Sequence, residues 1–386
     1  MSTLHSLRRR FATWLLEAAY PLWSERGIDA RSGGFVETLA QDGAALAQPR
    51  RARVPPRQVY AFAQARSVGW RGDARGIVRR GIDYFTARYR RPDGLFRERV
   101  DADGAPLSER ALLYDQAFAL LGFAAAAAAL DARAEFEAKA LELRHIITAR
   151  LRAADGSYCS DEGGGGRRES NPHMHLLEAY LAWAEIGLDA GWAEGVRGIA
   201  GLALSRFIRE DGGAIVESYL VTHGRDSTLA TWRPTADVAG GRIEPGHQFE
   251  WAWLLLRCER WQCPPLRAAA LRLISIGEQF GVHNAVAINA LNDDLTVKDA
   301  NARFWPQAER LKAALLAGAL TGEPRYWSMA EAAAMSWIPY LNTAVPGLWL
   351  DTQLPDGEFL DSPAPASTFY HLVGAIVALN HALAAA

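Results

Sequence analysis

Six stretches of this 386-residue chain resemble one another, and each opens an Ala/Leu-rich apolar run with polar or aromatic side chains. They begin at Arg57, Tyr114, Asn171, His247, Gln307 and Tyr370, which lie between 57 and 76 residues apart. This spacing accommodates one inward helix, one outward helix and a loop in every repeat. If six helices gather their polar N-terminal turns at one place, they form a pocket rich in histidine, carboxylate, arginine and aromatic groups. A pocket of that composition suits the binding of a sugar.

Six further segments alternate with these stretches and have apolar residues at three- to four-residue spacing, with charges on the remaining face. They cover residues 7–26, 73–90, 132–153, 191–209, 264–279 and 325–340. Because every repeat buries its apolar face against its neighbours, twelve alternating inner and outer helices predict an all-α (α/α)6 barrel. An open α-solenoid built from the same helix pairs is the alternative. No Pro- or Ser-rich linker divides the chain, so residues 1–386 are predicted to form a single catalytic domain.

Asp-Gly dipeptides flanked by short strand-like runs follow many of the outer segments. They occur at residues 93–94, 155–156, 211–212 and 356–357. Since Asp-Gly is a strong turn signal, these segments predict short β-hairpins confined to one mouth of the barrel. Residues 222–246 contain several Gly and Pro residues and show no period, which predicts an irregular wall or lid leading into His247.

Composition narrows the class of partner. The 42 basic and 44 acidic residues are intermixed and leave a net charge of −2, so we expect no nucleic-acid partner. The longest apolar run, residues 117–130, is shorter than the roughly 20 residues that a membrane helix needs, so we expect no membrane span. The basic N-terminus runs into an amphipathic segment rather than a signal-peptide core, and the three cysteines form no CxxC pair. We therefore expect a cytoplasmic protein, and the sequence leaves open whether it is a monomer or a homodimer.

His247 and Glu250 are three residues apart and share one face of a helix that Trp251 and the following leucines mark as buried. A histidine with a carboxylate one turn away is a candidate acid–base residue with its orienting partner. A capping histidine beside a solvated glutamate is the alternative. Burial favours the functional interpretation, because a buried histidine and glutamate without interaction partners would destabilise the fold.

His371 opens the last apolar helix, and by itself it would more often be a satisfied core histidine. His173, His175 and Glu178 share one helical turn, but residues two apart diverge on a helix, so we do not expect a metal site there. Arg57 begins a buried helix and should meet a carboxylate or a ligand oxygen, because an unpaired buried guanidinium is costly. Other candidates at equivalent helix starts are Tyr114, Asn171, Trp305, Gln307 and Glu309.

These motifs resemble those of the N-acylglucosamine 2-epimerase superfamily, and the resemblance covers essentially the whole chain. Its most specific marks are Asn-Pro-His-Met-His-Leu-Leu-Glu-Ala at 171–179, Gly-His-Gln-Phe-Glu at 246–250, Trp-Pro-Gln-Ala-Glu at 305–309 and Tyr-His at 370–371. The resemblance implies an (α/α)6 barrel that needs no metal or redox cofactor. It also implies that His247 and His371 are catalytic. The sugar pocket is then lined by Arg57, Tyr114, Asn171, His175, Glu178, Glu250, Trp305 and Glu309.

Two features of these motifs narrow the choice of reaction. His175 is similar to a histidine that members acting on N-acylated sugars tend to lack, which points to a free neutral monosaccharide. The disaccharide and mannose 2-epimerases carry a tryptophan just before the last histidine, and Ser-Thr-Phe-Tyr at 367–370 has none. That departure resembles the aldose–ketose isomerase branch.

We therefore expect interconversion of D-mannose and D-fructose through ring opening and a cis-enediolate, with lyxose and xylulose as a related pair. His371 would be the C2 base, His247 oriented by Glu250 would open the ring, and Arg57 would stabilise the developing oxyanion. The alternative is 2-epimerisation of mannose or an N-acylated sugar. Less favoured are an inverting glycosidase, which would use two of Glu178, Glu250 and Glu309 about 6.5–9.5 Å apart, and a non-catalytic helical binding module.

Overall fold

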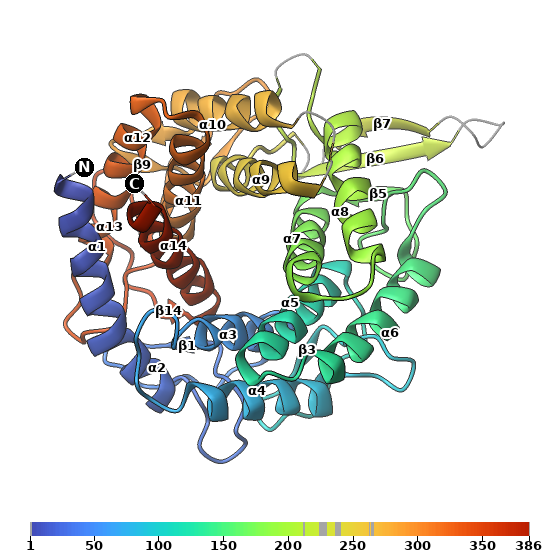
Figure 1. The fold of residues 1–386 in the computed structure, drawn as a ribbon, viewed down its shortest axis with the longest axis horizontal. Helices are drawn as coiled ribbons and strands as arrows, with labels where there is room; N and C mark the ends of the chain where they lie inside the picture. Colours follow the sequence, from blue (N-terminus) through green and yellow to red (C-terminus); the bar gives the residue numbers. More distant parts are fainter. Residues whose placement is uncertain are drawn as a thin grey trace.

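The computed structural model describes residues 2–210, 213–223, 230–235, 241–261, 263 and 266–385. Its helices form two concentric rings (Figure 1). The inner ring contains α3 (Val54–Ala63), α5 (Leu113–Leu130), α7 (Ser170–Ile186), α9 (Pro245–Arg257), α11 (Phe304–Thr321) and α14 (Ala366–Ala385). The outer ring contains α1 (Ser2–Trp14), π-helical η1 (Leu15–Ala19), α2 (Tyr20–Glu25), α4 (Ala74–Tyr89), α6 (Arg133–Leu151), α8 (Gly191–Leu202), π-helical η2 (Ala203–Phe207), α10 (Arg267–Gly281), α12 (Pro324–Met335) and α13 (Trp337–Tyr340). A short 3-10 helix, η3 (Cys258–Trp261), follows α9.

The inner ring is closed. Each inner helix packs against the next one in the chain, and α14 returns to pack against α3. The pairing of residues 38–39 with residues 364–365 joins the two ends of the chain a second time. Contact between the first and last inner helices confirms the predicted (α/α)6 barrel and excludes the open solenoid.

Helix α5 is long and apolar enough to cross a membrane by length and composition, with a mean hydropathy of 1.5 over 18 residues. In the fold, however, 78% of that stretch is buried. It is an inner-ring helix, covered by α3 and α7 at its sides and by α4 and α6 of the outer ring. Burial on all sides explains why α5 is apolar nearly all round.

Short antiparallel strands precede each of the six inner helices and therefore gather at the mouth where those helices begin. The strands are β1 (Thr38–Leu39), β2 (Arg50–Arg51), β3 (Arg99–Val100), β4 (Pro106–Ser108), β5 (Arg167–Glu169), β6 (Ser218–His223), β7 (Ala230–Pro234), β8 (Val282–His283), β9 (Val286–Ala287), β10 (Ala290–Leu291), β11 (Val297–Asp299), β12 (Ala302–Arg303), β13 (Thr352–Gln353) and β14 (Ala364–Pro365). Three of the predicted Asp-Gly turns are present, and Gly94, Gly156 and Gly357 have φ values of 84–92°. Such positive φ angles favour glycine. The fourth turn, at 211–212, lies outside the described residues.

The prediction that residues 222–246 are irregular is wrong in part. β6 extends to residue 223 and pairs with β7 as an antiparallel hairpin. Residues 224–229 and 236–240 lie outside the described part of the chain. β6 also pairs with β5, so the segment is attached to the strand that leads into α7.

A buried glutamine near the start of three inner helices holds the strand segment that follows the preceding outer helix. Gln116 pairs with the backbone N–H and C=O of Phe96, Gln248 with those of Ile215, and Gln307 with those of Ala287, each at 2.8 Å. In the third repeat His173 takes this place and accepts the N–H of Tyr158 at 2.9 Å. These amides satisfy buried backbone groups, so Gln307 is engaged in structure rather than directed at a ligand.

Replacing Gln307 with leucine should therefore lower stability. The change leaves the N–H and C=O of Ala287 without a partner, at about 1–3 kcal/mol for each buried group. Urea unfolding followed by circular dichroism should show an earlier midpoint. Gln279→Leu, at an exposed position on α10, is the matched control and should stay near wild type. Equal midpoints for the two variants would contradict this structural role for Gln307.

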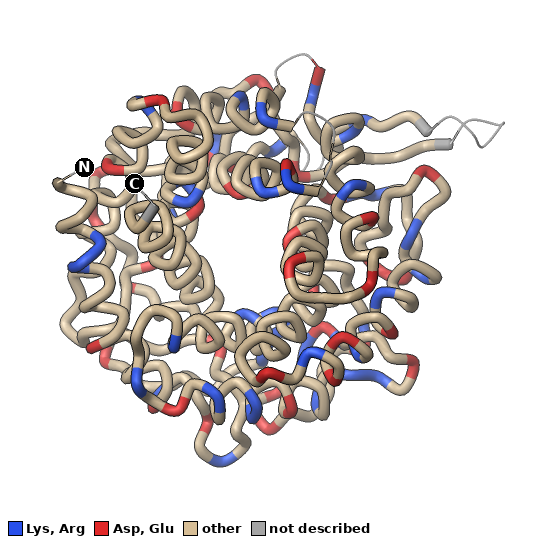
Figure 2. Tube along the Cα trace, in the orientation of Figure 1, with Lys and Arg blue, Asp and Glu red and all other residues tan. Residues whose placement is uncertain are grey.

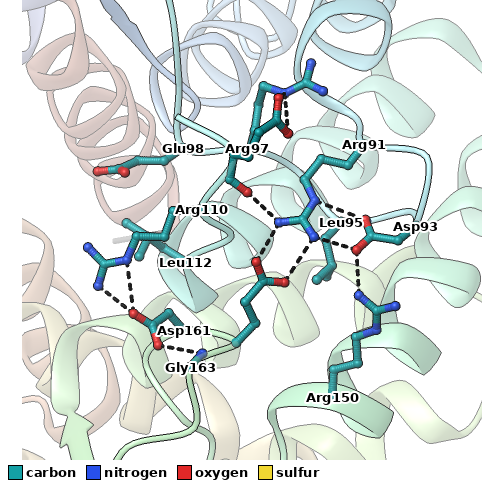
Figure 3. A network of polar contacts seen from close by, with 12 residues as sticks. Arg91, Asp93, Leu95, Arg97, Glu98, Arg110, Leu112, Arg150, Asp161 and Gly163 are labelled. Carbon is teal, nitrogen blue, oxygen red and sulfur yellow. Dashed lines mark hydrogen bonds and ion pairs between the residues drawn. The ribbon is translucent and has the colours of Figure 1, made fainter. Parts of the chain in front are cut away.

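An ion-pair network fastens the loops that lead into α5 and α7 (Figure 3). Arg91 binds Asp93 at 2.6 Å and Glu162 at 2.7 Å, and Arg110 binds Asp161 across the same gap. The network joins segments some 70 residues apart, so it helps to set how these two inner helices approach the mouth. Elsewhere, acidic and basic residues are interspersed around the outer ring (Figure 2).

Candidate active site

All six inner helices direct residues of their first turns into one cavity of about 250 Å³. It is lined by Arg51, Arg53, Arg57, Tyr114, Asn171, His175, Glu244, His247, Glu250, Arg303, Trp305, Ser367, Thr368 and His371. Eight of the ten predicted site residues are in this set. The other two, Glu178 and Glu309, are buried behind the histidines that they contact. Ring closure thus brings together polar helix starts that are up to 314 residues apart in the sequence (57 to 371).

The two histidines pack on the same indole. The ring centroid of Trp305 lies 5.1 Å from that of His247 and 5.3 Å from that of His371. His247 stands in the first turn of α9, which Pro245 begins, and His371 stands near the start of α14. Two imidazoles therefore face one pocket from the helices on either side of α11, which carries Trp305.

The partner of His247 is Glu217, which the sequence analysis did not identify. Nδ1 of His247 lies 2.9 Å from Oε2 of Glu217, so the expectation that Glu250 orients His247 is wrong. Glu217 follows the strand segment that Gln248 holds at Ile215, and its backbone carbonyl accepts the N–H of Ser170. The helical period could not reveal a carboxylate 30 residues away in an extended segment. The only available signal was the strand-like run after the Asp-Gly turn.

Carboxylates make His247 a strong base. Burial alone would lower its pKa, but Glu217 and Glu244 outweigh burial and raise the pKa of His247 to about 10. Glu244 lies 3.7 Å from Nδ1 and also pairs with Arg303. At neutral pH His247 is therefore an imidazolium that can donate a proton.

The pKa of His371 is shifted in the opposite direction from that of His247. Nδ1 of His371 lies 2.7 Å from Oε1 of Glu309. Burial, followed by the positive charges of Arg57 and Lys312, lowers the pKa of His371 well below its ordinary value. An ionised Glu309 can only accept a hydrogen bond, and with it the neutral ring would carry its proton on Nδ1 and have Nε2 as the basic nitrogen.

His175 and Glu178 form a third buried pair. Nδ1 of His175 lies 3.0 Å from Oε2 of Glu178, whose other oxygen accepts the hydroxyl of Tyr370. Burial lowers the pKa of His175 to about 4, so its ring is neutral. Glu178 thus holds His175 and Tyr370 in place, while His175 itself reaches the pocket.

Several polar atoms that face the pocket have no protein hydrogen-bond partner among the described residues. They are Nε of Arg57, Oδ1 of Asn171 and both carboxyl oxygens of Glu250. Arg57 donates to the hydroxyl of Tyr114 at 2.6 Å and stacks over Phe118, but forms no ion pair within the described chain. Burial and the neighbouring Glu309 raise the pKa of Glu250 well above its ordinary value. The pocket therefore offers donors and acceptors that match a polyhydroxylated ligand.

Histidine and carboxylate atoms come within 4.8 Å of one another in three groups, which are His175, Glu178 and Glu250; Glu217, Glu244 and His247; and Glu250, Glu309 and His371. In each group Nδ1 of the histidine is hydrogen-bonded to a carboxylate. His173 turns away from His175 and contacts the backbone of Tyr158 and Glu169. The His-x-His pair accordingly does not converge, and the absence of a metal requirement stays a prediction.

Comparison with known proteins identifies relatives along nearly the whole chain. Residues 33–375 match the family described as N-acylglucosamine 2-epimerase. A protein of Rhizobium meliloti (strain 1021) named mannose-6-phosphate isomerase is 42% identical over 389 residues, covering 98% of each chain. A D-mannose isomerase of Thermobifida fusca is 26% identical over 351 residues, covering 81% of this chain and 82% of that one. The structure of cellobiose 2-epimerase from Spirochaeta thermophila superimposes with a TM-score of 0.86 at 21% identity, covering 100% of this chain and 98% of that one.

Proposed function

Since the chain belongs to the N-acylglucosamine 2-epimerase family and is a carbohydrate-converting enzyme of the isomerase class, we propose that it interconverts D-mannose and D-fructose. D-Lyxose and D-xylulose are a related substrate pair. The observation that carries the proposal is that two imidazoles share one indole in the pocket and pair with different carboxylates, His247 with Glu217 and His371 with Glu309. The pKa of His247 is raised and that of His371 is lowered, which suits an acid at His247 and a base at His371. The relatives named for mannose isomerisation support the choice of sugar.

Ring opening comes first. The His247 imidazolium gives a proton to the ring oxygen as the C1–O5 bond breaks, and it receives the anomeric hydroxyl proton as the C1 carbonyl forms. Glu217 stabilises the imidazolium through Nδ1 and so leaves Nε2 as the transferring nitrogen.

Isomerisation then moves one carbon-bound proton. Nε2 of His371 removes the C2 proton, the electrons of that bond form the C1–C2 double bond, and O1 takes a proton from His247 to complete a cis-enediol. His247 next accepts the O2 proton as the C2 carbonyl forms, and His371 returns its proton to C1. Arg57 stabilises negative charge on the oxygens, because a fixed cation acts more strongly in a dry pocket than in water.

The remaining pocket groups bind hydroxyls. Asn171 and Glu250 offer polar atoms that have no hydrogen-bond partner among the described residues, and the raised pKa of Glu250 favours its neutral acid form. Trp305 offers an aromatic face, and Tyr114 steadies Arg57. Glu178 and Glu309, predicted as direct ligands of the sugar, we now assign to holding His175 and His371.

Incubation of D-mannose with the enzyme in D2O should yield D-fructose. Deuterium that enters during exchange at His371 should be found at C1 of the ketose, because the proton leaves C2 and returns to C1. NMR of the product mixture identifies both the sugar and the labelled carbon. Glucose as the sole product, labelled at C2, would instead establish 2-epimerisation, in which His247 returns the proton to C2 from the opposite face.

Mannose 6-phosphate is a second candidate substrate, favoured by the name of the rhizobial relative and by four arginines in the pocket wall. Three of the four, however, already face carboxylates: Arg51 pairs with Glu37, Arg53 with Asp115 and Arg303 with Glu244. That pairing favours the neutral sugar. Comparing kcat/KM for mannose and mannose 6-phosphate decides between them.

The glycosidase alternative fits the geometry poorly. Carboxylate oxygens of Glu250 lie within 4.8 Å of those of Glu178 and of Glu309, which is closer than the roughly 6.5–9.5 Å that inverting hydrolysis requires.

We also propose that the enzyme acts in the cytoplasm, in keeping with three free cysteines.

A further inference from the structure

A buried lysine lies behind the pocket. Lys312 stands on α11, and its side chain is 3% exposed. Its ammonium lies 2.8 Å from Oε2 of Glu309 and 3.0 Å from Oε1, and 3.8 Å from the ring centroid of Trp253. Burying an ammonium is expensive unless it is paired, so the position of this charge calls for a reason.

Lys312 is the inner end of a chain of polar contacts that reaches the pocket. Oε1 of Glu309 faces both Nζ of Lys312 and Nδ1 of His371, and His371 lines the cavity. Of Lys312, Glu309 and His371, only His371 borders the cavity. Lys312 thus does not border the sugar pocket, and among the described residues its hydrogen-bonded link to the pocket runs through Glu309.

The surroundings of Glu309 are rich in other ionisable groups. Those that face the cluster from the packed helices are Tyr60 and Arg57 on α3, His175 and Glu178 on α7, Glu250 and Arg257 on α9, and Tyr370 on α14. Oxygens of Glu250 and Glu309 lie within 4.8 Å of each other. Two buried carboxyls this close do not both ionise unless a cation compensates them.

The ionisation of Glu309 determines which nitrogen of His371 is basic. An ionised Glu309 accepts from Nδ1–H and leaves Nε2 free to take a proton. A protonated Glu309 would donate to Nδ1, the ring proton would move to Nε2, and the base facing the pocket would be lost.

We propose that Lys312 is a positioning residue that keeps Glu309 ionised and thereby holds His371 in the Nδ1-protonated tautomer. The role of His371 as the C2 base rests on the function proposed above, whereas the tautomer does not. The charges around Lys312 agree with this assignment. Burial alone would lower the pKa of Lys312, but its direct partner Glu309 is the main group that raises it above its ordinary value.

Lys312→Met tests the proposal. Long-range ¹H–¹⁵N spectra of histidine-labelled protein should show His371 protonated at Nδ1 in the wild type and at Nε2 in the variant. kcat for mannose should fall at least about tenfold, toward the roughly 10²-fold lower limit of a general base, with KM little changed. Lys312→Arg, which keeps the cation, should restore the wild-type tautomer.

Arg310→Met is the matched control. Arg310 is also buried on α11, and it pairs with Glu278 at 2.6 Å, away from His371. This variant should lose thermal stability and keep both the tautomer and kcat, which separates loss of a buried ion pair from the effect on His371.

An unchanged Nδ1 proton in folded Lys312→Met would overturn the proposal. If that variant does not fold, Glu309→Gln is the second test. In this variant Lys312 should donate to the amide oxygen, so that the amide N–H faces Nδ1 of His371. The ring should then again be protonated at Nε2. Retention of the Nδ1 proton there would equally refute it. A wild-type enzyme that has the expected tautomer but does not convert mannose would refute the proposed reaction and leave the tautomer assignment intact.

Discussion

His371→Asn should reduce kcat for mannose isomerisation by about 10²–10⁴-fold, the range that a general base contributes. Asparagine can still donate a hydrogen bond to Glu309, so the buried carboxylate keeps a partner, but it has no nitrogen that can take the C2 proton. KM should change little because the lost interaction belongs to the transition state. Single-turnover measurement of fructose formation checks the result.

The matched control is His173→Gln. His173 is buried like His371, but its ring bonds to the backbone of Tyr158 and Glu169 and does not reach the cavity. This variant should unfold at a lower temperature and retain kcat where it is folded. A folded His371→Asn enzyme with near-normal turnover would show that the pocket works without this base, as a non-catalytic or differently catalysed site would.

Glu217→Gln should lower kcat by about 10²-fold, the lower end of the general acid–base range, and narrow the pH range of activity. His247 acts as an acid only while protonated, and its pKa of about 10 depends on Glu217 and Glu244. The alkaline limb of the wild-type kcat profile should therefore lie near pH 10 and move to lower pH in the variant. Glu244→Gln should shift the limb less, because Glu244 is 3.7 Å from Nδ1 and does not hydrogen-bond to it.

The stability of the folded protein should also depend on the ion pair between His247 and Glu217. The pKa of His247 is raised in the folded state above the ordinary value of 6.5, so the ion pair contributes fully below pH 6.5 and its contribution is lost as pH rises toward 10. The pair also requires an ionised Glu217, and burial raises the pKa of Glu217 above its ordinary value. Wild type and Glu217→Gln should thus differ most in urea midpoint near neutral pH and converge at alkaline pH, where His247 loses its proton. A constant difference across this range would contradict the assignment of His247 as a cation.

Much of the site could be predicted because its residues follow the helical period. Arg57, Tyr114, Asn171, His247, Trp305 and His371 each open an apolar helix, and closure of the ring was enough to bring them together. Glu217 was missed because it lies in an extended segment, where no helix-based spacing links it to His247. Gln307 was interpreted as a ligand because helix starts look alike, whereas its amide is used by the backbone of Ala287. Lys312 carried no signal at all, since a single lysine in an apolar helix is indistinguishable from a surface residue until its neighbours are known.

The amino-acid sequence by itself determined the alternation of inner and outer helices, the Asp-Gly turns and the polar start of each inner helix, because these depend on periodicity and local backbone preference. Tertiary structure alone decided which carboxylate meets which imidazole: Glu217 with His247, Glu309 with His371 and Glu178 with His175. The charge of each histidine follows from these contacts, because neighbours within a few ångströms set the pKa of a buried group. Those neighbours come from helices and strands that are remote in the sequence.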